Sequence, residues 1–298
     1  MSDVRFSVVI LTYARDAILA DSLSRLFERL GARDDYEVIL VDNNIDRNGR
    51  EELLAPFAHR QYLFSGRNKG VHARNDGFDA ARGAYVVLLD DDVLVETADM
   101  LDRFAARFEE DARLGAITVR KRVRGETRRR VDLIPHTRKD VDLSQSFLTF
   151  RFVGGCVAFR TATLRETGGF LRDFFYGLEE IELSYRIIDA GWRIRYDPDV
   201  TCEELEHPAG RDTKRRVQTA RLANKYIISY LRMPFPEVLV NAALFTPYLM
   251  FRAGGEASVP GAIRQFLAWR RSPARPRRKA ISRATADYIR SCGGSVWR

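Results

Sequence analysis

Short runs of consecutive apolar residues recur along the N-terminal part of the chain, and each is the length of one strand. They cover residues 6–12, 36–41 and 84–89, with a further candidate at 61–65. Strands that are apolar on both faces are typical of parallel sheets covered by helices. Between the runs, apolar residues recur at helical spacing, as at Leu19, Leu23 and Leu26. This alternation predicts an α/β fold with a mainly parallel sheet and helices on both faces.

Three consecutive aspartates, Asp90, Asp91 and Asp92, follow the run at 84–89. Ligands of open α/β sheets bind beyond the carboxyl ends of the strands, so we expect these side chains at a ligand site. Neighbouring carboxylates repel one another, so their pKa values rise or a cation joins them. Oxygen ligands suit Mg²⁺ or Mn²⁺, which also bind phosphate oxygens. A second interpretation is a solvated cluster that caps a helix over residues 93–107.

Basic residues are concentrated at one end of the chain. Residues 211–298 contain 18 Lys or Arg and 4 Asp or Glu, whereas residues 1–210 contain 31 and 37. Such a difference indicates two parts with different partners. We therefore predict a domain over residues 1–210 and a basic, helical C-terminal extension over residues 211–298.

The cysteines and the N-terminus indicate a reducing compartment. Cys156, Cys202 and Cys292 are odd in number, widely spaced and without a CxxC pair. This pattern predicts reduced thiols, not a disulfide framework or a zinc site. No apolar run typical of a secretory signal follows Met1, so we expect a cytoplasmic protein.

The extension combines apolar and basic segments. Residues 214–233 show the pattern of an amphipathic helix, and residues 269–280 form a basic run interrupted by proline. Residues 235–251 are apolar but at or below the roughly 17–25 residues of a spanning helix, which favours an interfacial or packed segment. Together these segments predict peripheral contact with an anionic membrane, at the inner face of the cell membrane.

The same residues of the extension are compatible with other partners. Residues 214–251 have a second interpretation, as a segment that packs on the catalytic domain or forms a homodimer contact. Nucleic acid would also attract the charge. We expect no nucleic acid, because no recognition motif accompanies the basic residues.

Several motifs occur together and in a fixed order. They are "SVVILTYAR" near the N-terminus, "VDNN" at 41–44, "NKGVHARNDGFDAARGAYVVLLDDD" at 68–92, "GGCVAFR" at 154–160 and "YGLEEIELSYRIIDAGWRI" at 176–194. As a set, over roughly residues 5–210, they resemble the family 2 glycosyltransferases. The resemblance implies the GT-A fold, with a Rossmann-like nucleotide-binding half merged with an acceptor half.

The resemblance assigns donor-binding roles to matching positions. Asp42 would meet the nucleotide base, in a pocket that Thr12 and Tyr13 would line, and Arg74 would reach the nucleotide. In the DxD-type element, Asp90 and Asp91 would contact the nucleotide sugar and Asp92 would bind Mg²⁺ or Mn²⁺. Two of these residues also have a plainer interpretation. Asp42 would be a turn or cap residue, and Arg74 would form a surface ion pair.

The resemblance also implies a catalytic base. Inverting relatives usually deprotonate the acceptor hydroxyl with the Asp of an "ED" pair that opens a helix, and this chain has Glu179 and Glu180 there. The positive end of the helix favours an ionised carboxylate, so Glu180 is the candidate base and Glu179 its neighbour or an acceptor ligand. A wholly structural role, as acidic residues at a helix start, is the alternative. Glu182 is expected to pair with Arg186 four residues on.

Two further motifs complete the expected site. Gly154 and Gly155 would lie where backbone passes close to the donor sugar or acceptor, since they carry no side chain. His207, in "EHPAG", falls where many relatives have a metal-ligating histidine. After Gly210, the last residue of this motif, relatives often continue with serine, whereas this chain continues with Arg211 and Asp212.

The expected function is therefore inverting transfer of a sugar from a nucleotide diphosphate sugar, with UDP- or dTDP-sugars expected, to an acceptor hydroxyl. The product would be a polysaccharide, glycolipid or other glycoconjugate, and a lipid-linked glycan is among the expected acceptors. The alternative is a non-catalytic sugar-nucleotide or glycan-binding module, which the Glu in place of Asp keeps open. A nucleotidyltransferase would need a basic, glycine-rich loop after the first strand, and "TYARDAIL" has none.

Overall fold

The structure is a computed structural model of the whole chain. It describes residues 4–127, 130, 132–138, 140–205, 213–235, 237–252 and 255–295. Within these residues, nine strands form one sheet with the path β3-β2-β1-β4-β8-β6-β9-β5, and β7 pairs with β9. The strands are β1 (Phe6–Thr12), β2 (Tyr36–Asp42), β3 (Arg60–Phe64), β4 (Tyr85–Asp90), β5 (Val93–Val95), β6 (Leu114–Val123), β7 (Phe147–Thr149), β8 (Cys156–Arg160) and β9 (Arg193–Glu204).

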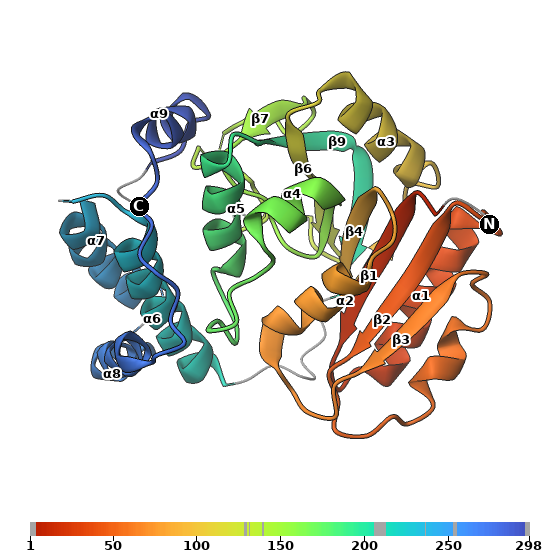
Figure 1. Cartoon of the computed structure of the whole chain (residues 1–298), viewed down its shortest axis with the longest axis horizontal. Helices are drawn as coiled ribbons and strands as arrows, with labels where there is room; N and C mark the ends of the chain where they lie inside the picture. Colours follow the sequence, from red (N-terminus) through yellow and green to blue (C-terminus); the bar gives the residue numbers. More distant parts are fainter. Residues whose placement is uncertain are drawn as a thin grey trace.

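Helices connect these strands and continue beyond them. They are α1 (Asp16–Leu30), α2 (Arg74–Ala80), α3 (Met100–Glu110), α4 (Thr161–Thr167), α5 (Glu179–Asp189), α6 (Lys214–Arg232), α7 (Glu237–Arg252), α8 (Val259–Arg271) and α9 (Arg283–Ser291), with short 3₁₀ turns η1 (Arg50–Leu54) and η2 (Gly70–Ala73). Figure 1 shows α6 to α9 gathered at the end of the molecule opposite the N-terminal strands. None of the helices, in the part of the chain that the structure describes, is long and apolar enough to cross a membrane.

The N-terminal half of the sheet is parallel, as predicted. β3, β2, β1 and β4 pair in parallel, whereas β8 pairs antiparallel with both β4 and β6. Alternate residues of β1 enter two different cores: Val8 packs with α1 and α3, and Val9 packs with α2 and α5. Coverage on both faces explains why these runs are almost entirely apolar.

The segment after the aspartate triplet corrects one interpretation. Residues 93–107 do not form one helix, because β5 occupies Val93–Val95 and α3 begins at Met100. The triplet therefore joins two strands and caps no helix. Cys156, Cys202 and Cys292 are free and buried, in agreement with the expected absence of a disulfide framework among them.

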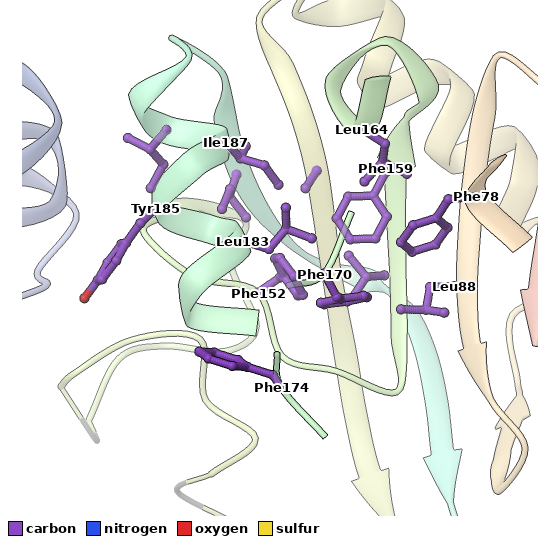
Figure 2. Packing of buried hydrophobic residues seen from close by; sticks show 14 of the residues in the cluster. Phe78, Leu88, Phe152, Phe159, Leu164, Phe170, Phe174, Leu183, Tyr185 and Ile187 are labelled. Carbon is purple, nitrogen blue, oxygen red and sulfur yellow. The ribbon is translucent and has the colours of Figure 1, made fainter. Parts of the chain in front are cut away.

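The core beneath α5 positions the candidate base. Figure 2 shows Leu183 and Ile187 pointing from α5 toward Phe159, with Tyr185 on the opposite side of the helix. Leu183, Ile187 and Phe159 are completely buried. Because packed apolar side chains fix the rotation of a helix about its axis, this core determines where the first turn of α5 points.

The C-terminal helices pack on the same helix. Ile227, Ile228 and Leu231 of α6 belong to the core cluster that includes Leu183 of α5. Arg232 Nη2 lies 2.7 Å from Glu182 Oε1, and Arg186 Nη2 lies 2.7 Å from Glu182 Oε2. The expected pair of Glu182 with Arg186 is confirmed, and Glu182 also fastens α6 to α5. The predicted division near residue 210 falls outside the described residues and stays a prediction.

The Glu182→Ala variant is expected to lower the free energy of unfolding by about 3–5 kcal/mol, because it leaves two guanidinium groups without their buried partner. Denaturant unfolding measures this change. The matched control is Glu28→Ala on α1, whose carboxylate is exposed beside Arg25 and whose loss should cost about 0.5 kcal/mol or less. Equal effects of the two substitutions would contradict the structural role of Glu182.

Candidate active site

The aspartate triplet lies at the carboxyl edge of β1 and β4, as predicted. Thr12, the last residue of β1, donates from its hydroxyl to Asp91 Oδ2 at 2.9 Å. Arg15 Nη1 lies 2.9 Å from Asp91 Oδ1 and 2.7 Å from Asp92 Oδ2. Ala14, between Tyr13 and Arg15, has a φ of 57°, a strained conformation for a residue with a Cβ. The end of β1 is thus shaped to bring Arg15 against the two carboxylates.

The carboxylate of Asp92 lies among other negative charges, and such a group attracts a cation. Burial raises the pKa of Asp92 to about 7, and the adjacent Asp90 and Asp91 add to the shift while Arg15 opposes it. No three His, Cys, Asp or Glu side chains form a ready-made metal site anywhere among the described residues. The donor set still fits Mg²⁺ or Mn²⁺, because crowded carboxylate oxygens are the ligands these ions prefer. In this structure the guanidinium of Arg15 provides the positive charge beside Asp91 and Asp92.

Arg74 connects the triplet to the start of α5. Its Nη2 lies 2.5 Å from Asp90 Oδ1, and its Nη1 lies 3.7 Å from Glu179 Oε1. Burial would raise the pKa of Asp90, but Arg74 and Lys121 hold it below its usual range. One guanidinium therefore joins the two acidic groups that the sequence placed about 90 residues apart. Arg74 is an internal partner of both, not the surface ion pair of the plainer interpretation.

Glu179 and Glu180 open α5 as expected, in different surroundings. Glu179 is buried, whereas Glu180 is partly exposed. Burial raises the pKa of Glu179 to about 8, the charge of Glu180 adds to the shift, and Arg74 opposes it. Leu178, the residue before the helix, has a φ of 67°, so the backbone is strained where the pair begins. Because a general base must be ionised and must reach its substrate, the geometry favours Glu180 over Glu179.

The two glycines after β7 lie between the triplet and Glu180. A Cβ on Gly154 would come within 2.6 Å of Glu180 Oε1, and a Cβ on Gly155 would come within 2.8 Å of Lys121 Nζ. Gly155 also has a φ of 98° and accepts a hydrogen bond from the Asp90 amide at 2.9 Å. The backbone here passes close to side chains of the site itself, which explains why neither position carries a side chain.

The Gly154→Ala variant is expected to lower kcat about tenfold to a hundredfold while the chain stays folded, because the new methyl group displaces the carboxylate of Glu180 by about an ångström. Rates of the sugar transfer that the sequence resemblance implies, with circular dichroism as the check on folding, measure this. The control is Gly125→Ala, outside the site, where the added Cβ meets nothing within 4 Å. Its φ of 77° strains the backbone of any residue with a Cβ, so the control tests a local backbone change that leaves Glu180 in place, and its folding is checked in the same way. Transfer rates equally reduced in both variants would contradict this role of Gly154.

The pocket predicted for the nucleotide base is closed over Asp42. Asp42 is completely buried. It accepts hydrogen bonds from the Asn44 side chain at 2.7 Å and from the Tyr62 hydroxyl at 2.5 Å. A nucleotide base would have to displace one of these partners in order to bind Asp42. Direct contact of the nucleotide base with Asp42 therefore stays a prediction. Tyr13 is partly exposed beside this region, whereas Thr12 is completely buried and its hydroxyl donates to Asp91. Their roles in a base pocket stay predictions.

Several residues of this region lay outside the sequence prediction. Arg15 stands in the quoted motif "SVVILTYAR", three residues after β1 ends, and its position at the sheet edge was the available signal. Lys121 and Glu204 pair at 3.0 Å, and Lys121 Nζ donates to the Gly154 carbonyl at 3.0 Å. Nothing in the sequence marks this pair, because β6 and β9 meet only in the folded sheet. His207 lies outside the described residues, so its predicted role as a metal ligand stays a prediction.

The comparisons with known proteins agree with this fold. The family model described as "Glycosyl transferase family 2" matches residues 7–168. The chain belongs to this family, which places it among the glycosyltransferases that take a sugar from a nucleotide sugar. The sheet with its flanking helices is the GT-A fold, as the sequence predicted.

Curated relatives match over about half to two thirds of the chain. An uncharacterized protein of Haemophilus influenzae is 26% identical over 169 residues, which are 54% of this chain and 90% of that protein. The poly-beta-1,6-N-acetyl-D-glucosamine synthase of Staphylococcus aureus is 24% identical over 204 residues, which are 64% of this chain and 48% of the synthase. The match thus spans about half the length of that synthase.

Solved structures share the fold over more of the chain. The mannosyltransferase PcManGT of Pyrobaculum calidifontis, solved with GDP-Man and Mn²⁺, has a TM-score of 0.59 at 22% identity and covers 96% of this chain and 79% of its own. TarS of S. aureus (residues 1–349), solved with UDP-GlcNAc, has a TM-score of 0.58 at 15% identity and covers 83% of this chain and 73% of its own. At these identities the likeness is one of fold.

Proposed function

We propose that this chain is an inverting, metal-dependent glycosyltransferase that moves a sugar from a nucleotide diphosphate sugar to an acceptor hydroxyl. The observation that carries the proposal is the bridge by Arg74, which lies 2.5 Å from Asp90 and 3.7 Å from Glu179. Through it the acidic triplet and the carboxylate pair of α5 border one site. Such a transferase needs a group that receives the diphosphate and a base that takes a proton.

The proposed reaction assigns one task to each side of the site. The acceptor oxygen attacks the anomeric carbon of the donor, and the bond from that carbon to the phosphate oxygen breaks with its electrons on the departing nucleotide. Glu180 takes the proton of the acceptor hydroxyl. Asp92, with Asp90 and Asp91 beside it, would hold Mg²⁺ or Mn²⁺, which supplies compensation for the charge of the diphosphate. In-line attack inverts the configuration of the anomeric carbon.

The positive side chains around the triplet have a supporting task. Arg15, Arg74 and Lys121 face the carboxylates in this structure. When a nucleotide diphosphate enters with its cation, each of these groups can turn toward a phosphate oxygen. A planar guanidinium suits two such oxygens. The nucleotide is proposed to be uridine or deoxythymidine diphosphate, and the structures solved with GDP-Man or UDP-GlcNAc show that the fold accepts different bases.

A non-catalytic module that binds a sugar nucleotide or a glycan is the second candidate. The observation in its favour is the ion pairing of Arg15 with Asp91 and Asp92, which already balances part of their charge without a metal. A binding module needs no base, and Glu180 would then be a helix-opening residue only.

Donor turnover separates the two candidates. A panel of nucleotide sugars is incubated with the full chain and Mn²⁺, and released nucleotide is measured with and without EDTA. The transferase is expected to release nucleotide from at least one donor, and EDTA should stop the release. Calorimetry that finds nucleotide binding without any release over a wide set of acceptors would support the binding module instead.

A further inference from the structure

The outward face of α7 is apolar along its length. Leu239, Leu244, Tyr248 and Phe251 are 65%, 51%, 56% and 86% exposed. Ala243 and Pro247, which lie between them on the helix surface, are exposed as well. No charged residue occurs from Val238 to Phe251. A surface helix of a globular protein normally turns polar residues to water, so this face lacks its partner.

The inward face of α7 is already occupied. Leu249 is buried against Leu222 and Ala223 of α6, and Phe245 packs against the same cluster. The Ser229 hydroxyl of α6 donates to the Asn241 side chain at 2.7 Å. The helix is therefore anchored by one face, and its opposite face is exposed to solvent.

The length of α7 limits what this face contacts. Its 16 residues span about 24 Å, less than the roughly 30 Å of a hydrocarbon core. Pro247 lies inside the helix and interrupts its hydrogen bonds. A helix of this length with one apolar face suits a position parallel to a membrane surface, with the apolar face at the boundary between headgroups and acyl chains.

Positive charge accompanies the apolar face. On α8, Ile263 and Leu267 are exposed together with Arg264 and Arg271, and residues 277–279 add three more exposed basic side chains. No Asp or Glu occurs between residues 257 and 286. Apolar contact combined with a basic cluster is the pair of features that holds a protein on anionic lipid.

The basic segment and α7 meet at one point. Arg278 lies over the ring of Phe235 at 5.4 Å and donates to the Met233 carbonyl at 2.7 Å, just before α7 begins. Figure 1 shows α7 and α8 together at one end of the molecule, with α6 nearer to the sheet. Both helices pack on α6, so the apolar and basic features lie at the same end of the molecule.

This surface is linked to the candidate base. Burial lowers the pKa of Arg151, and the charges of Glu180 and Tyr248 both oppose the shift. Asn224 of α6 donates to the carbonyls of Tyr176 at 3.0 Å and Gly177 at 2.7 Å, directly before α5. α6, on which α7 packs, is thus fixed directly to the segment that precedes Glu179 and Glu180.

We propose that α7, α8 and the basic segment after α8 dock this chain on an anionic membrane surface, where it takes an acceptor hydroxyl carried by a lipid. The acceptor part of this inference rests on the proposed function, whereas the docking does not. Charge complementarity favours lipid as the partner of this surface. A second copy of this chain would bring its own basic segment against the basic segment of the first, whereas anionic headgroups bring the opposite charge.

Flotation of the full chain with lipid vesicles tests the docking. One set of vesicles contains phosphatidylcholine alone, and the other contains equal parts of phosphatidylcholine and phosphatidylglycerol. The wild type is expected to float with the mixed vesicles and about tenfold less with the neutral ones, and added salt should weaken the binding. The double variant Leu244→Glu with Phe251→Glu should lose at least about tenfold of the binding. The matched control is Ile45→Glu, because Ile45 is 76% exposed outside the C-terminal helices, and it should float like the wild type.

Three results would overturn the docking. They are failure of the wild type to float with the mixed vesicles, equal flotation of the double variant, and a wild-type dimer in light scattering that the double variant converts to monomers. Nucleotide release without vesicles is measured on the same samples. The double variant should keep it, because neither residue belongs to the active site, and loss of flotation is then separable from failure of the proposed reaction.

Discussion

The Glu180→Gln variant is expected to lose about 10²- to 10⁴-fold in kcat for sugar transfer, the range that a positioned general base contributes. Gln keeps the size of the side chain but takes no proton from the acceptor. Glu180 is partly exposed, so the fold should tolerate the change. Steady-state transfer to an acceptor under saturating donor measures the effect.

The neighbouring carboxylate provides the matched control for this prediction. Because the pKa of Glu179 is raised to about 8, Glu179 carries its proton at neutral pH, and Gln resembles that neutral form. Glu179→Gln should therefore keep most of the wild-type kcat. Glu180→Asp, which restores the residue that relatives usually have, should keep more activity than Glu180→Gln. A severe loss in Glu179→Gln together with full activity in Glu180→Gln would show that the base was assigned to the wrong residue.

The buried Glu179 also predicts the direction in which the stability of the fold changes with pH. Its folded pKa of about 8 lies above the ordinary value of 4.5, so the folded state binds this proton more tightly than the unfolded state. The contribution of Glu179 to stability is therefore fully present below about pH 4.5 and is lost as the pH rises through 8. Removing the group should flatten this part of the stability profile, so Glu179→Gln should gain most over the wild type at alkaline pH.

The Asp92→Asn variant is expected to lose about 10²- to 10³-fold in metal-dependent transfer, because one charged oxygen donor to the cation is replaced by a neutral amide. Binding of Mn²⁺, followed by calorimetry in the presence of nucleotide diphosphate, should weaken in parallel. Arg15 keeps Asp91 as a partner at 2.9 Å, so the fold should be maintained.

An exposed aspartate is the control for this second prediction. Asp99 has a half-exposed carboxylate beside Arg103, away from the triplet, and Asp99→Asn should leave transfer and Mn²⁺ binding unchanged. Full transfer by Asp92→Asn would remove Asp92 from the proposed metal site.

The parallel half of the fold was predictable because burial leaves a direct mark on the sequence. The run at 6–12 coincides with β1, and the run at 36–41 gives β2 to within one residue. Helical spacing at Leu19, Leu23 and Leu26 found α1 because all three face one core. The antiparallel pairing of β8 with β4 and β6 was not predictable, since it depends on contacts between segments far apart in the sequence.

The site was predictable as far as motifs reach. The motifs placed the triplet, Arg74 and the carboxylate pair, and the structure brings them together through Arg74. They did not reveal that Arg15 pairs with Asp91 and Asp92, because a single arginine after a strand has no pattern of its own. The difference between Glu179 and Glu180 also depends on burial, which adjacent identical residues do not disclose.

A crystal structure of the full chain with a nucleotide diphosphate sugar and Mn²⁺ would test the central claim most directly, through the position of the anomeric carbon. We predict that the diphosphate and the ion lie against Asp92, that Arg15 has left the two aspartates, and that the anomeric carbon faces the carboxylate of Glu180. A donor bound with its diphosphate away from Asp92, or with Glu180 turned out of the site, would contradict the account.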